Sequence, residues 1–466
     1  MDHSAPAALA ENGRLTKQLA ASVLSISYDT LLRRDVEQIE KLILDHLGCT
    51  ARGATMPWGE ALRAWAEPHK GSGKARIMGT QLKTAPAIAA FVNATAAHGL
   101  ELDDTHDESV SHPGAPVIAT ALALASHAGY NGKEVLAAIA AGYEVIGRVG
   151  AATGANAIIA NGFHPTSLFT PFGAAATAGH LLRLSPEQLC HAWGLALSMA
   201  GGSMQFSQET SGTTVKRLHG GYGALHGVMA AELARLGIDG PLQAFDGAYG
   251  LCNNFGSKPV AERLAKAAIE PLEIHRVSFK PYPCCRLFHS TLDALREVTD
   301  DFTLAPEKIA RINVGGPSIM VSQHMISRPA SVMAAQYSLP YTLGAAFYHG
   351  PTSVDGFSVE AMKDQRILAI ADKVSAEFCQ QMEDQFPAHF GSWIELTDTD
   401  GNLRRSDVLD SLGTPANPMS VDVLIEKFDS LTAELKLPMN GAEVMKTVGN
   451  LRRGRSAKTL LSGFCR

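Results

Sequence analysis

The sequence lacks the features that mark several large classes of protein. Its seven cysteines are an odd number, and no CxxC spacing occurs among them. This usage predicts reduced thiols in a reducing compartment rather than a disulfide framework, and the only adjacent pair, Cys284 and Cys285, cannot easily bind one metal together. Long apolar runs are also missing, because the longest, near residues 115–125, is too short to span a bilayer.

An excess of positive charge is absent as well. The 466 residues carry a formal net charge of -6 at pH 7, which argues against a general binder of nucleic acid or of membrane surfaces but leaves room for local basic pockets. The first residues, MDHSAPAALAENGRLTKQL, contain no continuous apolar stretch of the kind found in a signal sequence. We therefore expect a soluble, cytoplasmic protein with neither nucleic-acid nor membrane partners.

What the sequence does contain is a large store of apolar residues, arranged mostly with helical spacing. With 46% hydrophobic and 18% charged residues the chain is typical of a globular protein, and its length favours two domains. Between about residues 15 and 265 apolar residues recur every three or four positions, as in RRDVEQIEKLILDHLG, a predicted helix that we expect to end at Gly48. Another predicted helix opens with a capping box, formed by Ser185 and Gln188.

The pattern changes near residue 270, where segments typical of strands begin. LEIHRVSF and ARINVGG alternate and hold β-branched residues, and SWIELTDTDGNLRRSDVLD predicts a hairpin with Asp400 and Gly401 at its turn. SVMAAQYSLPYTLGAAFYHG and SVEAMKDQRILAIADKV are predicted helices, and MSVDVLIEKFDSLTAEL is a helix that we expect to rejoin the first domain. The predicted fold is mainly α, with a large all-helical domain over 1–269 and 409–466 and a smaller α+β domain over 270–408.

Polar groups concentrate in five stretches whose surroundings are small or apolar. The first is ELDDTHDESVSHPG, which starts at Glu101 and holds five carboxylates and two imidazoles. The other four stretches, in chain order, are NGFHPTS with His164, GTTVKRLHGG with Lys216 and Arg217, SFKPYPCCRLFH with Lys280 and Arg286, and SRPASVMAAQYSLPY with Tyr337. Together they supply cations for a multiply charged anion and groups for proton transfer.

Each of these residues also has a structural interpretation that involves no catalysis. Asp103 and Asp104 would cap the helix that begins near Pro113, His164 would pack between helices, and Tyr337 would belong to the core. Lysines are ordinary surface residues, although Lys216 lies in the first turns of a predicted helix, where the helix dipole disfavours a cation and a partner is needed.

A metal site is not expected from the sequence. The best candidate ligands in the acidic stretch are His106, Asp107 and His112, but their spacing matches no zinc signature. We therefore predict neither a metal nor an organic cofactor.

The ordered succession ELDDTHD, HPG, NGFHPTS, TTVKRLHGG and FKPYPCC resembles the MmgE/PrpD family. That family includes 2-methylcitrate dehydratase, cis-aconitate decarboxylase and iminodisuccinate epimerase. The resemblance implies a large all-helical domain, a smaller α+β lid domain, a homodimer, and a site between the two domains that works without a cofactor.

The family pattern also implies roles for individual residues. Its acidic positions fall on Glu101, Asp103 and Asp104. Its helix-borne lysine falls on Lys216, and the lysine of its lid domain falls on Lys280. The residues implied as catalytic are Asp103, Asp104, His112, His164 and Tyr337, and those implied as substrate-binding are Thr105, Lys216, Lys280, Arg217 and Arg286. The stretch 105–112 is about one residue longer than in the decarboxylase members, lacks the Trp that often follows DDT, and is more acidic.

These relatives act at a carbon next to a carboxylate, so a positioned base and charges that stabilise an enolate-like intermediate are needed. Carboxylates beside His112 could supply an acid and a base with separated pKa values. We expect a cofactor-independent lyase that acts on a small di- or tricarboxylate. Dehydration of a 2-methylcitrate-like substrate is the favoured reaction. The alternatives are decarboxylation of cis-aconitate, epimerisation of a dicarboxylate, and a protein that binds carboxylates without catalysis.

Overall fold

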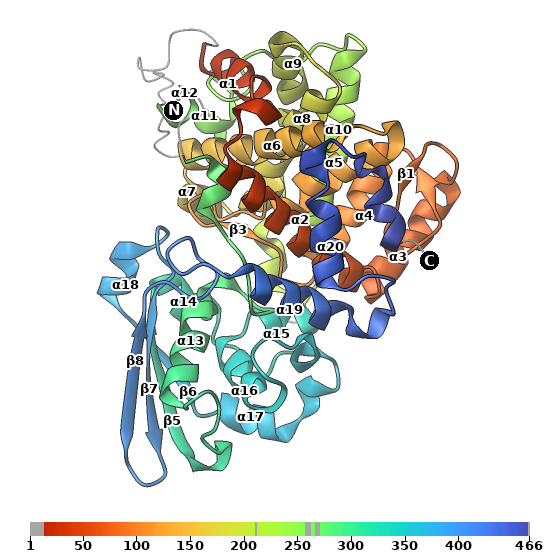
Figure 1. Ribbon diagram of the computed structural model, residues 1–466. Helices are drawn as coiled ribbons and strands as arrows, with labels where there is room; N and C mark the ends of the chain where they lie inside the picture. The colour runs from red at the N-terminus through yellow and green to blue at the C-terminus, as the bar shows by residue number, and fades with distance from the viewer. Residues whose placement is uncertain (1–13, 210–211, 257–261, 266–270, 465–466) are drawn as a thin grey trace.

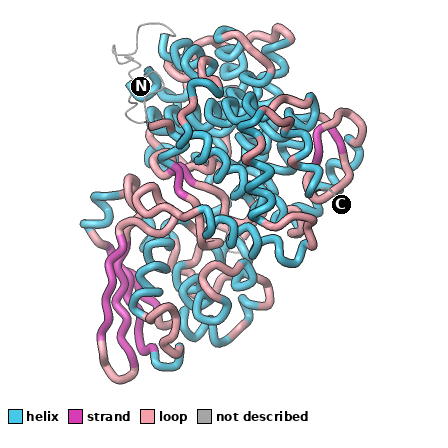
Figure 2. Tube along the Cα trace, in the orientation of Figure 1, coloured by secondary structure: helices cyan, strands magenta, loops and turns pink. Residues whose placement is uncertain are grey.

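The computed structural model describes residues 14–209, 212–256, 262–265 and 271–464. About 60% of it is helical, so the mainly α prediction is confirmed. Figure 1 shows a helical unit above a smaller mixed unit, and Figure 2 shows that the one extended group of strands lies in the smaller unit. The six cysteines in the described part of the chain are all free.

The helical unit is built from the first twelve helices and the last two. Its helices are α1 (Arg14–Leu24), α2 (Arg33–Gly53), α3 (Pro57–Ala66), α4 (Pro86–His98), α5 (Gly114–Ala128), α6 (Gly132–Thr153), α7 (Ala155–Ala160), α8 (Pro165–Leu181), α9 (Pro186–Leu197), α10 (Val215–Arg235), α11 (Leu251–Phe255), α12 (Glu262–Ala265), α19 (Val421–Thr432) and α20 (Gly441–Val448). A short pair, β1 (Ala75–Arg76) and β2 (Lys83–Thr84), lies at its edge. One apolar core joins residues 19–279 to residues 419–464, so the C-terminal helices do rejoin this unit.

Close helix packing explains one wrong prediction. Helix α2 does not end at Gly48 but continues to Gly53. A Cβ atom at Gly48 would lie 3.1 Å from Cδ2 of Phe428 on α19, so this glycine makes room for a neighbouring helix instead of ending its own. The capping box at Ser185 is confirmed, because its hydroxyl accepts a hydrogen bond from the backbone N–H of Gln188 at 3.1 Å and the Gln188 side-chain oxygen accepts one from the backbone N–H of Ser185 at 2.9 Å.

Helix α6 is longer and more apolar than the sequence analysis allowed for. By length and composition it could cross a membrane, which the run near residues 115–125 could not. However, 94% of its most apolar window is buried inside the protein, as expected for a core helix.

The smaller unit holds a four-stranded sheet with helices against it. Strand β4 (Val277–Ser278) leads into this unit, with Val277 still in the core of the helical one. The elements of the smaller unit are α13 (His289–Val298), β5 (Ile309–Gly316), α14 (Ser318–Gln323), α15 (Val332–Gln336), α16 (Leu339–His349), α17 (Gln365–Ala371), β6 (Val374–Phe378), α18 (Gln380–Gln385), β7 (Ser392–Asp398) and β8 (Leu403–Val408). The strand order is β6-β5-β7-β8, with only β5 and β6 parallel. The predicted hairpin is confirmed as β7–β8, with Gly401 at a φ of 88° in the turn.

The segment LEIHRVSF, predicted as a strand, folds differently. Glu273–Arg276 forms a 3₁₀ turn, and only the two residues of β4 are extended. Strand β4 pairs with β3 (Thr105–His106) of the acidic stretch and not with the larger sheet, so Thr105 faces Ser278 across the ladder. This pairing brings the acidic stretch next to the segment that carries Lys280.

The helical predictions in the smaller unit are confirmed in part. The first predicted helix is interrupted at Tyr337, and Ser338 then caps α16 by accepting a hydrogen bond from the backbone of Tyr341 at 3.0 Å. In the second, only α17 and a 3₁₀ turn are helical. The domain boundary at 269 lies outside the described residues, and the domain limits stay predictions.

Candidate active site

The acidic stretch between α4 and α5 is buried and not a solvated surface loop. Glu101, Asp103, Asp104, Thr105 and His106 are each at most 3% exposed. The backbone of Glu101 has a φ of 57°, in the left-handed region that side chains other than glycine rarely adopt. Such strain persists only where the surrounding structure imposes it, and it often marks a functional position.

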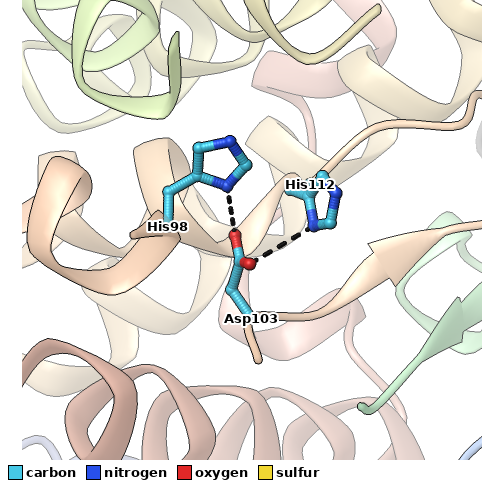
Figure 3. A group of neighbouring side chains, drawn as sticks. All are labelled: His98, Asp103 and His112. Atoms are coloured by element: carbon cyan, nitrogen blue, oxygen red, sulfur yellow. Dashed lines mark hydrogen bonds and ion pairs between the residues drawn. The ribbon is translucent and has the colours of Figure 1, made fainter. Parts of the chain in front are cut away.

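Asp103 holds two histidines, as Figure 3 shows. Its Oδ2 lies 2.8 Å from Nδ1 of His98, and its Oδ1 lies 3.4 Å from Nδ1 of His112. Burial alone would raise the pKa of Asp103, but the imidazoles of His112 and His98 hold it well below its usual range. Asp103 is therefore ionised, and its carboxylate holds the His112 ring in place.

The tautomer of His112 follows from a third contact. Its Nδ1 lies 2.9 Å from the backbone oxygen of Asp104, and a carbonyl oxygen can only accept. The Nδ1 atom therefore carries a proton, which leaves Nε2 as the ring nitrogen that exchanges one. Because His112 lines the cavity described below, it can present that nitrogen to a ligand.

His98, Asp103 and His112 could by their spacing also hold a metal ion, since one ligand atom from each lies within 4.8 Å of the others. This trio differs from the one considered from the sequence, His106, Asp107 and His112. The Nδ1 atoms that face Asp103 are both engaged in hydrogen bonds, that of His98 with Asp103 and that of His112 with the Asp104 carbonyl, so a metal bound through them would have to displace these contacts. The contacts thus fit a hydrogen-bonded triad better than a metal centre, and metal independence stays a prediction.

Asp104, the neighbour of Asp103, has the contacts of a helix cap. Its Oδ1 accepts a hydrogen bond from the backbone of Gly114 at 2.8 Å, and its Oδ2 accepts one from the Tyr143 hydroxyl at 2.6 Å. Gly114 is the first residue of α5, so Asp104 satisfies an otherwise unpaired N–H of that helix. Burial raises the pKa of Asp104 to about 8. Asp104 does not line the cavity, so its predicted catalytic role has no direct contact behind it.

Glu101 is the carboxylate around which the buried cations gather. Lys216 contacts its Oε1, Lys280 Nζ lies 3.6 Å from its Oε2, and the Tyr337 hydroxyl donates to Oε2 at 3.4 Å. Both lysines are fully buried. Burial would raise the pKa of Glu101, but Lys216 and Lys280 lower it, so this carboxylate is ionised. Lys216 thus has the partner that its place in the first turn of α10 requires.

Lys280 keeps capacity to bind an anion. Among the residues that the structure describes, its ammonium has no hydrogen-bond partner, although it is fully buried. Arg286 also has a buried donor without a partner, because its Nε forms no hydrogen bond within the described chain. Its other guanidinium nitrogens are engaged: one donates to the Ser411 hydroxyl at 3.0 Å and another lies 3.5 Å from Asp107. Buried donors without partners are costly unless a ligand satisfies them.

A cavity of about 280 Å³ lies between the two units. This is near the lower end of ligand pockets, which measure about 300–1,000 Å³. Predicted site residues in its lining are Thr105, His112, His164, Lys280, Arg286 and Tyr337, joined by Glu101 and, from the smaller unit, by Cys285, Met333 and Phe390. The cavity thus lies where the site was expected, between the helical and mixed units, and its role as the active site stays a prediction.

The other predicted site residues lie behind or away from this lining. Asp103 and Lys216 support His112 and Glu101 from behind. Arg217 is farther removed: its guanidinium stacks 3.9 Å from the centre of the Trp58 ring and donates to Gln336 at 3.3 Å. The contacts of Arg217 therefore do not support a direct role in substrate binding.

The sequence analysis matched Glu101 to an acidic position of the family but gave it no catalytic or binding role, and it did not single out His98. A signal for Glu101 was present, because Lys216 in a helix first turn needed a carboxylate, although the sequence did not say which one. His98 ends an apolar helix, and no local pattern distinguishes it from a core histidine.

Comparison with known proteins agrees with this geometry. The MmgE/PrpD N-terminal domain matches residues 17–263, and the MmgE/PrpD C-terminal domain matches residues 282–443. The chain belongs to the MmgE/PrpD family. The resemblance inferred from the motifs is thereby confirmed.

Three curated relatives span nearly the whole chain. The cis-aconitate decarboxylase of Homo sapiens is 27% identical over 94% of this chain and 92% of its own length. The cis-aconitate decarboxylase of Aspergillus terreus is 24% identical over 96% and 95%. A cis-aconitate decarboxylase-like protein of Aspergillus oryzae is 24% identical over 91% of both chains.

Proposed function

We propose that this MmgE/PrpD protein is a cofactor-independent lyase that decarboxylates a small tricarboxylate of the cis-aconitate type. The observation that carries the proposal is the buried Lys280 ammonium, unpaired by hydrogen bonds within the described chain, in a cavity that also contains Arg286 and His112. Such a cavity is suited to a polyanion whose reaction needs proton transfer. The names of the relatives support decarboxylation over the 2-methylcitrate-type dehydration that the sequence alone favoured.

The chemistry follows from where charge develops. When the bond to a carboxylate breaks, carbon dioxide leaves and its electron pair moves into the neighbouring double bond, so a proton must reach the far carbon of that double bond. Lys280 and Arg286 would hold the remaining carboxylates and stabilise the enolate-like charge. His112, with its Nδ1–H held by Asp104 and Asp103, is the proposed proton donor: in its doubly protonated form it gives the Nε2 proton to carbon and keeps the proton on Nδ1.

A panel of citrate, 2-methylcitrate, cis-aconitate and substituted succinates, analysed by mass spectrometry, tests the proposal. Loss of carbon dioxide from cis-aconitate supports it. Loss of water from 2-methylcitrate would instead establish the dehydratase alternative, and a stereochemical change without a change of mass would establish the epimerase. If calorimetry detects binding of these acids but none is converted, the protein is a carboxylate binder and the proposal is wrong.

Two further expectations belong to the same proposal. The homodimer implied by the family resemblance can be tested by light scattering of the purified chain. The cytoplasmic location expected from the sequence can be tested by cell fractionation.

A further inference from the structure

Two histidines face each other through the same ring atom at one wall of the cavity. Nδ1 of His164, at the N-cap of α8, lies 2.8 Å from Nδ1 of His219 on α10. The ring centres are 4.9 Å apart, and both residues are buried. At this distance the two nitrogens share a hydrogen bond, so one of them carries the proton and the other accepts it.

This contact couples the two tautomers. If His219 holds the shared proton, the neutral His164 ring has its proton on Nε2 and can donate it. If His164 holds the shared proton, its Nε2 has a lone pair and can accept one. Among the described residues, no hydrogen bond to the Nε2 atom of either ring is seen, so both outer nitrogens can exchange protons.

The pair separates two cavities. His164 lines the active-site cavity, whereas His219 lines a second cavity of about 420 Å³ together with Tyr222 and His226, and Glu209 lies at both. Phe206 lies in the wall of both and contacts both rings, with ring centres 5.5 Å and 5.6 Å away. A proton that crosses this wall can therefore pass through the two imidazoles.

The surroundings disfavour a charged imidazole at either position. The positive or ionisable groups that face the pair are His98 from α4, His112 from the acidic stretch and Lys216 from α10. Glu209 lies at both cavities, and His226 lies at the second. Burial, together with these neighbours, lowers the pKa of His164 well below its ordinary value and that of His219 to about 3. A route that keeps both rings neutral is therefore favoured.

We propose that His219 is a positioning residue that acts through His164, and that the two imidazoles give and take protons as a neutral pair connected to the second cavity. This inference rests on the proposed function, in which His112 gives one proton to carbon in each decarboxylation and must regain it. When His164 donates its Nε2 proton, through cavity water, to His112, its Nδ1 takes the shared proton from His219, and His219 takes a proton at Nε2 from water in the second cavity, which leaves hydroxide there. After product leaves, His164 takes a proton at Nε2 from water in the active-site cavity, the shared proton returns to His219, and His219 gives its Nε2 proton back to that hydroxide. Each turnover therefore draws its one proton from active-site water, and the hydroxide formed there balances the charge.

Replacing His219 tests the pair directly. We expect His219→Ala to lower kcat by roughly 10-fold or more, within the range for impaired proton transfer, while KM changes by less than about 2-fold. Imidazole added to the buffer should restore part of kcat, in proportion to its concentration, because the second cavity can admit it. His219→Asn keeps a polar side chain but has no ring to relay a proton, so its kcat should be equally low. A low kcat in this variant as well would show that the effect of His219→Ala does not come from a loss of folding.

His226→Ala is the matched control. His226 lies on the same helix and lines the same cavity, but it stacks on Tyr222, with ring centres 6.0 Å apart, instead of contacting His164. This variant should keep its kcat and show no response to imidazole. Equal losses in the His219 and His226 variants, or a His219→Ala variant with full kcat, would overturn the inference.

A spectroscopic measurement separates this inference from the proposed function. In protein labelled with ¹⁵N-histidine, the wild type should show one proton shared between the two Nδ1 atoms, and His219→Ala should change the tautomer population of His164. If the wild type converts none of the panel, the proposed function fails, and this measurement alone decides the inference. A His164 tautomer population that is the same in His219→Ala as in the wild type would contradict the inference.

Discussion

Two adjacent aspartates should respond in opposite ways to the same substitution. Asp103 is ionised between two imidazoles, whereas burial keeps Asp104 protonated near neutral pH, because its pKa is raised to about 8. Asparagine resembles a protonated aspartate in shape and can satisfy both partners of Asp104, Gly114 and Tyr143. We therefore predict that Asp104→Asn is tolerated and Asp103→Asn is not.

The size of the effect on stability follows from the pKa of Asp104. Its value rises from 3.8 to about 8 on folding, so between these pH values the folded state binds a proton that the unfolded state does not. The stability from this group is complete below 3.8 and is lost as pH rises toward 8. The free energy of unfolding of the wild type should fall by roughly 1.4 kcal/mol per pH unit from this group, which is about 3 kcal/mol between pH 5 and pH 7. The Asp104→Asn variant should not show this loss.

Urea unfolding of the wild type and both variants at pH 5 and pH 7 measures this difference. The advantage of Asp104→Asn over the wild type should grow by about 3 kcal/mol from pH 5 to pH 7. An extra amide N–H without a partner would cost about 1 kcal/mol, but equally at both pH values, so it cancels in the comparison. Asp103→Asn should be less stable than the wild type at both. A difference between Asp104→Asn and the wild type that is the same at both pH values would mean that Asp104 is ionised in the folded protein.

Three further predictions concern the cavity. Lys216→Met should destabilise the protein by about 3–5 kcal/mol, because it leaves Glu101 buried with a weaker partner, and adding Glu101→Gln should recover part of that loss in the same unfolding assay. His112→Ala should lower kcat by roughly 10²–10⁴ with little change in KM, and full turnover at saturating substrate would exclude it as the proton donor. Treatment with a strong chelator should leave activity unchanged; loss of activity that zinc or iron restores would make His98, Asp103 and His112 a metal site.

Local signals were sufficient where neighbours in sequence decide the structure. The capping box at Ser185 and the hairpin turn at Gly401 depend on hydrogen bonds and φ angles within a few residues, and both were predictable. Gly48 was misjudged because a helix-ending glycine and a packing glycine look alike until the partner, Phe428, is known. That partner is 380 residues away in the sequence, beyond any local pattern.

The candidate site shows the same division. Polar residues in apolar surroundings identified the acidic stretch, and the dipole argument predicted that Lys216 needs a partner. The sequence could not say that Glu101 was that partner, because five carboxylates lie in the same stretch. The choice depends on the packing of α10 against α4 and on the turn at Glu101, whose φ is 57°, and no local pattern predicts either.

The charges around Glu101 connect the fold to the proposed chemistry. One carboxylate faces two buried ammonium groups, those of Lys216 and Lys280, and only Lys216 has it as a close partner. The remaining positive charge is costly in an apolar interior, so the fold can keep it only if packing elsewhere offsets the cost. A substrate carboxylate beside Lys280 would remove that cost and bind the folded state alone, which would stabilise the protein by mass action. Under the proposed function, the buried charge that weakens the protein is therefore also the charge that binds the polyanionic substrate.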